Sequence, residues 1–263
     1  MKRLLSMMMV ITMVTSLAIF NSSAISPATA SAELGNEEGF INSELVVAEE
    51  DNPMFVNGDN GEPSPEAIDV AALGGLDAIM PLTRFSVPDF ATLPVPVCKQ
   101  ENGHYCGPAT AQQLIRLFGN DYATTQEDIA NSMGISEKGS SLSQIVKYVE
   151  KSGYAVYRIL KNLSIEEMHR LIGANISSYY TPPIGRLKFW KVGNWPYKTS
   201  GHFLNISGYD YTNHSDAIEE CEIRLTDPNI QRVQPNSSGS YYVTLGEFHQ
   251  ATMDHDQKEI GCC

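Results

Sequence analysis

The sequence is poor in the features that mark several common classes of function. Basic residues are few: 18 Lys and Arg stand against 31 Asp and Glu, a net charge of −13. No basic patch rises from this background, which disfavours nucleic-acid binding. No glycine-rich phosphate loop is present, and no Cys-x-x-Cys pair or histidine cluster has the spacing of a zinc site. We therefore expect neither a cofactor nor a metal.

Long hydrophobic runs are also scarce, and the longest lies near the N-terminus. Two basic residues precede an apolar stretch over residues 7–20, and small residues follow it. This order is typical of a secretory signal peptide over residues 1–30, with cleavage expected after Ala30 or Ala32. The stretch is shorter than the about 20 residues that cross a bilayer, so an uncleaved anchor is the less favoured alternative. We expect a secreted protein without a membrane span after cleavage.

The acidity of the chain is concentrated in the segment that follows. Residues 31–93 carry 13 acids against the single Arg84, whereas the 170 residues of 94–263 carry 18 acids and 15 bases. The negative net charge therefore does not indicate a site for basic substrates on the domain. A segment with dense negative charge and few aromatics is not expected to pack a core of its own. We expect residues 31–93 to be a disordered linker or a pro-segment.

A cysteine that opens a helix is the strongest chemical signal in the chain. Pro108 stands two residues past Cys106, a place that suits the first helical turn because its missing N–H costs nothing there. Cys106 is thus expected at a helix N-terminus, where unsatisfied N–H groups and the macrodipole favour thiolate over thiol. Most single cysteines are small buried apolar residues, so a catalytic role depends on partners.

Candidate partners follow in the second half of the chain. His202 opens an apolar, strand-like run, where an imidazole can point into a cleft and accept the proton of a thiol. A second strand-like run over 221–225 leads to Asp227, which could orient that imidazole and stabilise its charged form. Asp227 precedes a proline, and Asp-Pro is also a common turn start. Taken alone, Asp227 is better explained as a turn residue.

Four residues in a fixed order resemble the site of the papain-fold cysteine peptidases: Gln100, Cys106, His202 and Asp227. The run Tyr105-Cys106-Gly107-Pro108-Ala109 looks most like the bacteriocin-leader-processing (double-glycine) peptidase family and its secreted stand-alone relatives, over residues 93–253. The resemblance implies that a peptide or protein is the substrate. It also implies that Gln100 donates its side-chain amide to the oxyanion beside the Cys106 N–H, a contribution of about 100- to 1000-fold in turnover.

The same residues leave other functions open. An acyltransferase or transpeptidase would use the same triad and pass the acyl group to an amine, and phytochelatin synthases carry a similar Tyr-Cys-Gly run. A catalytically silent binding or immunity module would keep the fold without the chemistry. Because the resembled peptidases cut after double glycines, the pair Gly74-Gly75 raises the alternative of self-processing after Gly75, although a flexible turn is the favoured interpretation.

Hydrophobic periodicity and capping signals predict an α+β fold. Helices are expected over 107–118, 125–133 and 141–151 and from Ser164, and strands over 154–160, 183–190, 202–209, 221–225 and 240–245. We therefore expect one papain-like domain over residues 94–263. Its helical half would carry Cys106 and its antiparallel sheet half would carry His202 and Asp227, with the cleft between them.

Two further features have no single interpretation. The other four cysteines could form disulfides after export, in three possible pairings; they are Cys98, Cys221, Cys262 and Cys263. Lysines alternate with aromatic residues just before His202, which favours an exposed loop over the sheet and, as the alternative, a substrate-contacting rim; they are Lys188, Trp190, Lys191, Trp195, Tyr197 and Lys198. The oligomeric state is not indicated.

Overall fold

The structure is a computed structural model that describes residues 55–80, 87–189, 195–212 and 217–263. The predicted signal peptide over residues 1–30 lies outside this part of the chain. Within it, no helix is both long and apolar enough to cross a membrane.

The strands of the described residues share one nine-stranded sheet. They are β1 (Phe55–Asn57), β2 (Ile68–Asp69), β3 (Phe90–Thr92), β4 (Arg158–Lys161), β5 (Ile184–Phe189), β6 (Lys198–Asp210), β7 (Glu222–Thr226), β8 (Ser240–Thr244) and β9 (Glu259–Cys262). The order is β2-β4-β9-β5-β6-β7-β8, and β1 and β3 also pair with β6. All pairs among β4 to β9 are antiparallel, as predicted, whereas β1–β6 and β2–β4 are parallel.

Helices cover the sheet, and capping boxes open four of them. They are α1 (Cys106–Gly119), α2 (Gln126–Met133), α3 (Leu142–Lys151), α4 (Ile165–Ala174), α5 (Ile230–Val233) and α6 (Leu245–Asp254), with a π-helical turn η4 (Asn175–Tyr179) and short 3₁₀ turns η1 (Ala71–Leu73), η2 (Leu76–Ala78) and η5 (Ile218–Glu220). The boxes begin α2, α3, α4 and α6. Those at Ser141 and Ser164 agree with the prediction, which omits α6 although Thr244 and Glu247 form the same pattern.

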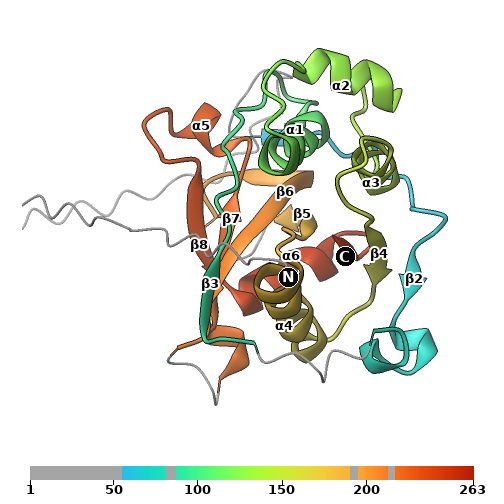
Figure 1. Ribbon diagram of the computed structural model, residues 1–263, viewed down its shortest axis with the longest axis vertical. Helices are drawn as coiled ribbons and strands as arrows, with labels where there is room; N and C mark the ends of the chain where they lie inside the picture. Colours follow the sequence, from blue (N-terminus) through green and yellow to red (C-terminus); the bar gives the residue numbers. More distant parts are fainter. Residues whose placement is uncertain (1–54, 81–86, 190–194, 213–216) are drawn as a thin grey trace, which may run out of the picture. The chain divides into compact units, whose positions relative to one another are not determined.

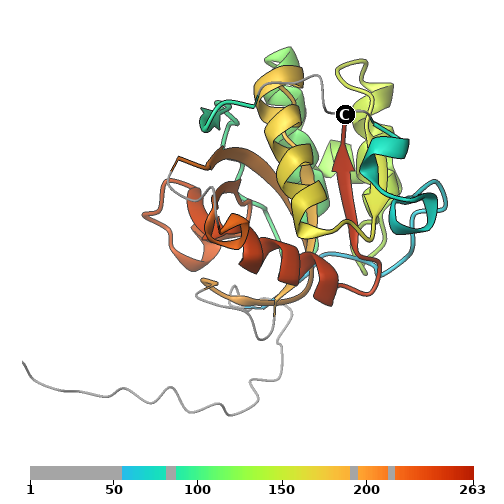
Figure 2. The ribbon, with the colours of Figure 1, turned by 90° about the horizontal axis from the view of Figure 1, so that it is seen from below.

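Strand β6 separates two hydrophobic cores because its successive side chains point to opposite faces. Phe203 packs with residues of α1 to α3, whereas Leu204 and Ile206 belong to a larger core with residues of α4 and α6. Figure 1 shows α1, α2 and α3 grouped at one end of this domain, and Figure 2 shows α4 and α6 crossing beside one another. The helical half and the sheet half of the predicted α+β fold are both present.

The described part of residues 31–93 is ordered, unlike the disordered linker that its composition predicts, and the alternative of a pro-segment stays a prediction. This part contributes β1, β2 and β3 to the sheet, and Val70, Leu76 and Met80 are buried in the larger core. Its composition indicates that it cannot build a core alone. It is ordered nevertheless, because its few apolar side chains enter a core that the rest of the domain supplies.

All five cysteines of the chain lie in the described residues, and each is a thiol rather than half of a disulfide. Burial raises the pKa of the Cys98 and Cys263 thiols to about 11. A thiol with so high a pKa holds little thiolate at neutral pH. Neither of these two cysteines therefore competes with Cys106 as a candidate nucleophile.

Candidate active site

Cys106 is the first residue of α1 and is fully buried. Side chains cap α2, α3, α4 and α6, whereas no described side chain caps α1 and its first turn holds no acidic residue. The N–H groups at this end of α1 are therefore available to a negative charge that develops beside them.

Buried hydrogen bonds that the sequence does not reveal hold α1 against β6. The Asn205 amide donates to the Thr110 carbonyl oxygen (3.1 Å) and to Gln113 Oε1 (2.8 Å). The Thr110 hydroxyl donates in return to the carbonyl oxygen of Phe203 (3.1 Å). Because Phe203 is the neighbour of His202, these bonds place the helix of the thiol beside the strand of the imidazole.

His202 and Asp227 form a fully buried hydrogen-bonded pair. His202 Nε2 lies 2.9 Å from Asp227 Oδ1, and neither side chain is exposed. An ionised carboxylate can only accept, so Nε2 carries the proton in this bond. The other ring nitrogen, Nδ1, makes no hydrogen bond to nitrogen or oxygen within the described residues, which leaves it available to the Cys106 thiol.

The charge state of His202 follows from these neighbours. Burial alone would lower the pKa of the imidazole, but the Asp227 carboxylate and the Cys106 thiol raise it to about 9 from the ordinary 6.5. The ring is therefore an imidazolium at neutral pH. An imidazolium in this position can donate a proton to a departing group.

The Asp227 carboxylate accepts hydrogen bonds from three further donors. Tyr197 and Tyr241 donate their hydroxyls to Oδ2 at 2.6 and 2.8 Å. The Asn229 N–H donates to Oδ1 at 2.8 Å. Burial opposes ionisation of Asp227, but the His202 ring and these donors hold the pKa of the carboxyl below its usual range. The carboxylate is thus kept charged and fixed in orientation.

Tyr197 corrects one prediction. The prediction places it in an exposed loop or rim, yet it is 3% exposed and contacts the His202 ring edge-on at a centroid distance of 5.7 Å. Burial and the nearby Asp227 raise the pKa of both Tyr197 and Tyr241 well above 10, so both phenols remain donors. No spacing rule identifies these two residues, because their role depends on the folded neighbours of Asp227.

The other residues of that lysine and aromatic stretch differ in their surroundings. Trp195 stacks on Phe189 with a centroid distance of 4.2 Å, so it belongs to the same aromatic cluster as Tyr197. Trp190 and Lys191 lie outside the described residues. The aromatic side chains that are described therefore pack on the sheet rather than extend into solvent.

Replacing Asp227 by Asn is expected to move the pKa of His202 from about 9 toward its ordinary value, because burial then acts with less opposition. In the wild type, the pKa of His202 is higher in the folded state, about 9, than its ordinary value of 6.5. The charged ring therefore contributes fully to the free energy of unfolding below pH 6.5, and this contribution is lost as the pH rises through about 9. NMR titration of the His202 ring in the wild type and the variant measures the change.

The matched control for this titration is Asp254→Asn, which removes an exposed carboxylate at the end of α6. It should leave the titration of His202 unchanged. A His202 pKa that stays near 9 in Asp227→Asn would contradict the assignment of Asp227 as the group that keeps the ring charged.

Gln100 is fully buried and tied to the strand end that carries Asp227. Its backbone N–H donates to the Pro228 carbonyl oxygen (2.9 Å), and its side-chain Nε2 donates to the Asn102 carbonyl oxygen (2.8 Å). This side-chain bond uses one of the two protons on Nε2. The role of Gln100 as an oxyanion donor stays a prediction.

Gly58, and not Gly75, lies at the thiol. A Cβ atom on Gly58 would collide with Cys106 Sγ and would lie 3.1 Å from the His104 carbonyl oxygen. Gly75 lies beside Glu167 of α4 instead, and Figure 1 shows residues 71–78 far from α1 within this domain. In this structure the double glycine is therefore not presented to Cys106.

The residues brought together have the composition of an acyl-transfer site. A thiol stands at a helix N-terminus, an imidazolium lies beside it, and a buried carboxylate holds that ring. Among the described residues, no group of three His, Cys, Asp or Glu side chains is arranged to hold a metal ion. A thiol, an imidazole and a carboxylate in this arrangement can transfer a proton, form a covalent thioester and release it again.

Comparison with known proteins adds a family to this geometry. Residues 92–245 match the model of the peptidase C39-like family. Among solved structures, a protein from Bacillus anthracis described as a C39-like peptidase is similar at 15% identity, with 67% of this chain and 98% of that chain covered and a TM-score of 0.46. The peptidase domain of Streptococcus ComA, a bifunctional ABC transporter involved in a quorum-sensing pathway, is similar at 15% identity, with 64% and 96% covered and a TM-score of 0.42. No curated protein sequence matches significantly.

Proposed function

Because the chain belongs to the peptidase C39-like family, we propose that it is a cysteine peptidase that hydrolyses peptide bonds through Cys106. In this proposal His202 is the base, Asp227 orients it, and Gln100 contributes to the oxyanion hole. The observation that carries the proposal is the buried His202–Asp227 hydrogen bond of 2.9 Å next to a thiol that opens a helix. Such a pair has a defined chemical use, since it stores the proton that the thiol gives up.

The reaction would proceed in two halves. His202 Nδ1 holds the proton of Cys106, and the thiolate attacks the peptide carbonyl carbon to form a C–S bond. The Cys106 N–H and Gln100 Nε2 stabilise the oxyanion. His202 then protonates the leaving amine as the C–N bond breaks. Water attacks the thioester carbonyl carbon while one of its protons passes to Nδ1, and the C–S bond then breaks to return the thiolate beside the imidazolium. The acid product gives its remaining proton to solvent and leaves as a carboxylate.

Hydrolysis and transpeptidation differ in the group that accepts the acyl chain. We would incubate the full chain with a peptide library in water enriched in oxygen-18 and analyse the products by mass spectrometry. Hydrolysis predicts new C-terminal carboxylates that carry one solvent oxygen atom. Products joined through new amide bonds would instead support an acyltransferase. A folded protein that yields no product, and in which Cys106 reacts only slowly with alkylating agents, would support a silent binding module.

We also propose that the peptidase works outside the cell, on the basis of the N-terminal pattern of residues 1–30. Expression of residues 1–263 should yield protein in the medium whose N-terminus is Ser31 or Glu33. Protein that stays in the cells and begins at Met1 would contradict export.

A further inference from the structure

The backbone of residues 57–61 crosses the thiol and is held on both sides. Strand β1 runs parallel to β6 and places Asn57 opposite Gly201, the residue before His202. On the other side, the Ser140 N–H donates to the Gly58 carbonyl oxygen, and the Asn60 N–H donates to the Ser140 carbonyl oxygen, both at 2.9 Å. The segment thus fills the space between the strand of the imidazole and the loop before α3.

Glycines on both walls allow this close approach. A Cβ atom on Gly139 would collide with the Gly58 carbonyl oxygen, and a Cβ atom on Gly201 would lie 2.6 Å from the Cβ atom of Asp59. Any larger residue at either wall position would push the segment away from Cys106. The groove is therefore shaped to hold a peptide backbone against the thiol.

Asp59 anchors the segment in a buried pocket. Arg186 donates to both carboxylate oxygens of Asp59, from Nε and from Nη2, each at 2.6 Å. His255 Nε2 lies 2.8 Å from Asp59 Oδ2. The side chains of Arg186 and Asp59 are 0% and 1% exposed. A buried carboxylate is stable only when it is paired and hydrogen-bonded in this way, so the pocket is specific for one acidic side chain.

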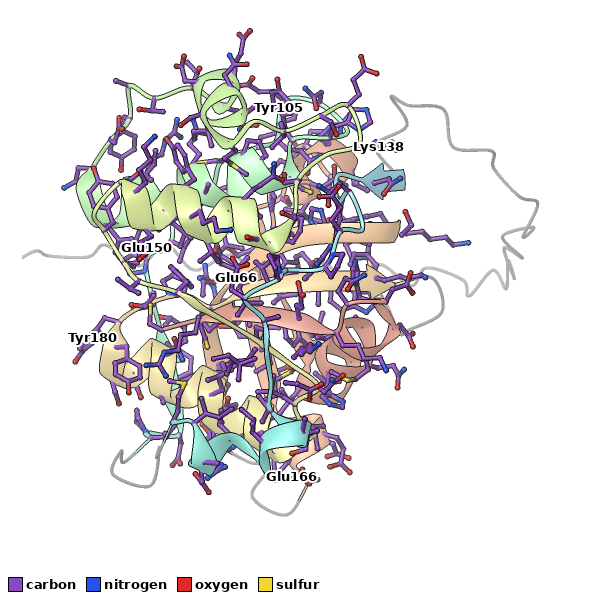
Figure 3. All side chains as sticks on the ribbon, turned by 90° about the vertical axis from the view of Figure 1, so that its right-hand side faces the viewer. Glu66, Tyr105, Lys138, Glu150, Glu166 and Tyr180 are labelled. Atoms are coloured by element: carbon purple, nitrogen blue, oxygen red, sulfur yellow. The ribbon has the colours of Figure 1, made fainter. Side chains whose placement is uncertain are left out.

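The pocket belongs to the domain rather than to the segment. Arg186 lies on β5, and its Nη1 donates to Glu259 on β9 at 2.6 Å. Ser64, which follows the segment in the same N-terminal stretch, also donates to this carboxylate from its N–H (3.0 Å) and its hydroxyl (2.9 Å). Beyond the segment, the chain passes Glu66. Figure 3 shows this stretch running from the end of the domain that holds Tyr105 and Lys138 toward the end that holds Glu166.

We propose that residues 57–61 occupy the groove over Cys106 in the intact chain as an inhibitor, with Asp59 bound in the Arg186–His255 pocket, and that an acidic side chain of a substrate peptide takes the place of Asp59 there. This inference rests on the proposed function. The segment blocks the thiol without being cut, because the Gly58 carbonyl oxygen is bound by the Ser140 N–H rather than by the proposed oxyanion donors. A substrate must displace it.

The first test is Gly58→Ala in the full chain. The added methyl group meets Cys106 Sγ, so the segment should leave the groove although Asp59 and its partners in the pocket are unchanged in sequence. We expect iodoacetamide to alkylate Cys106 about tenfold faster or more, because the state in which the segment has left the thiol becomes populated. Mass spectrometry identifies Cys106 as the alkylated residue. Cleavage of library peptides should rise with it.

The matched control is Ser132→Ala, which puts the same small side chain at an exposed position of α2, outside the segment. Its alkylation rate should equal that of the wild type. Equal rates for Gly58→Ala and the wild type would overturn the inhibition. A chain cut between Gly58 and Asp59 in a Cys106-dependent manner would overturn it as well, because the segment would then be a substrate.

The second test concerns the carboxylate pocket. A peptide with the sequence of residues 55–62 should slow the alkylation of Cys106 in the Gly58→Ala variant. The same peptide with Asp59→Asn should protect at least about tenfold less well, since a buried arginine would face a neutral partner. Equal protection by the two peptides would overturn the assignment of the pocket.

These measurements separate the inhibition from the proposed function, because alkylation requires no peptide cleavage. If Gly58→Ala were alkylated faster than the wild type but cleaved no library peptide, the inference that residues 57–61 cover the thiol would be supported. The peptidase assignment would be contradicted. If library peptides were cleaved, and if both the cleavage rate and the alkylation rate were the same in the wild type and in Gly58→Ala, the peptidase assignment would be supported. The proposed inhibition would be contradicted.

Discussion

A chain with Cys106→Ala is expected to cleave no peptide of the library, because no other group in the site can form the thioester. Loss of the nucleophile from such a set lowers kcat by a factor on the order of 10⁶, which is below detection. The measurement is made in the wild-type chain and in the Gly58→Ala background, so that the segment over the thiol does not mask the difference.

The fold of Cys106→Ala should persist, since the change removes one buried sulfur atom and costs about 1–2 kcal/mol of unfolding free energy. The matched control is Cys263→Ala, which removes a partly buried thiol at the end of the chain and should leave cleavage unchanged. If Cys106→Ala cleaved peptides as fast as its parent, Cys106 would not be the nucleophile.

A second strong loss of activity is expected for Gln100→Ala. Removal of one oxyanion donor typically lowers kcat by about 100- to 1000-fold, with little change in KM because the donor acts mainly on the transition state. Steady-state kinetics on a library-derived peptide measures both constants. The backbone bond from Gln100 to Pro228 does not involve the side chain, so the loop should keep its course.

The matched control for Gln100 is Gln250→Ala, which makes the same substitution on the exposed face of α6. Its kcat and KM should equal those of the wild type. A Gln100→Ala variant that raises KM and leaves kcat unchanged would indicate a role in substrate binding rather than in stabilising the oxyanion.

Signals that act over a few residues predict the local structure well. The capping boxes at Ser141 and Ser164 begin α3 and α4, because each box joins groups only three residues apart. Pro108 places Cys106 at the start of α1 for the same reason. The other end of this helix is predicted less exactly: the left-handed residue that closes α1 is Asn120, and Gly119 is still helical.

Contacts between distant segments are not predictable in this way. Asp59 and Arg186 are 127 residues apart, and the composition around Asp59 indicates disorder because nothing local reveals a buried guanidinium partner. The bonds of Tyr197 and Tyr241 to Asp227 likewise join three different segments. Each of these contacts depends on strand register and on the core between the strands.

The class of chemistry can be inferred from the order of residues alone, because a thiol at a helix start and a later histidine and aspartate have few common uses. Folding settles which groups meet: His202 with Asp227, α1 with β6, and Gly58 with Cys106. The physical reason is the distance along the chain between the groups that interact. Helix starts depend on neighbours within one turn, whereas a site that is covered by its own chain depends on pairing between segments that meet only when the sheet has formed.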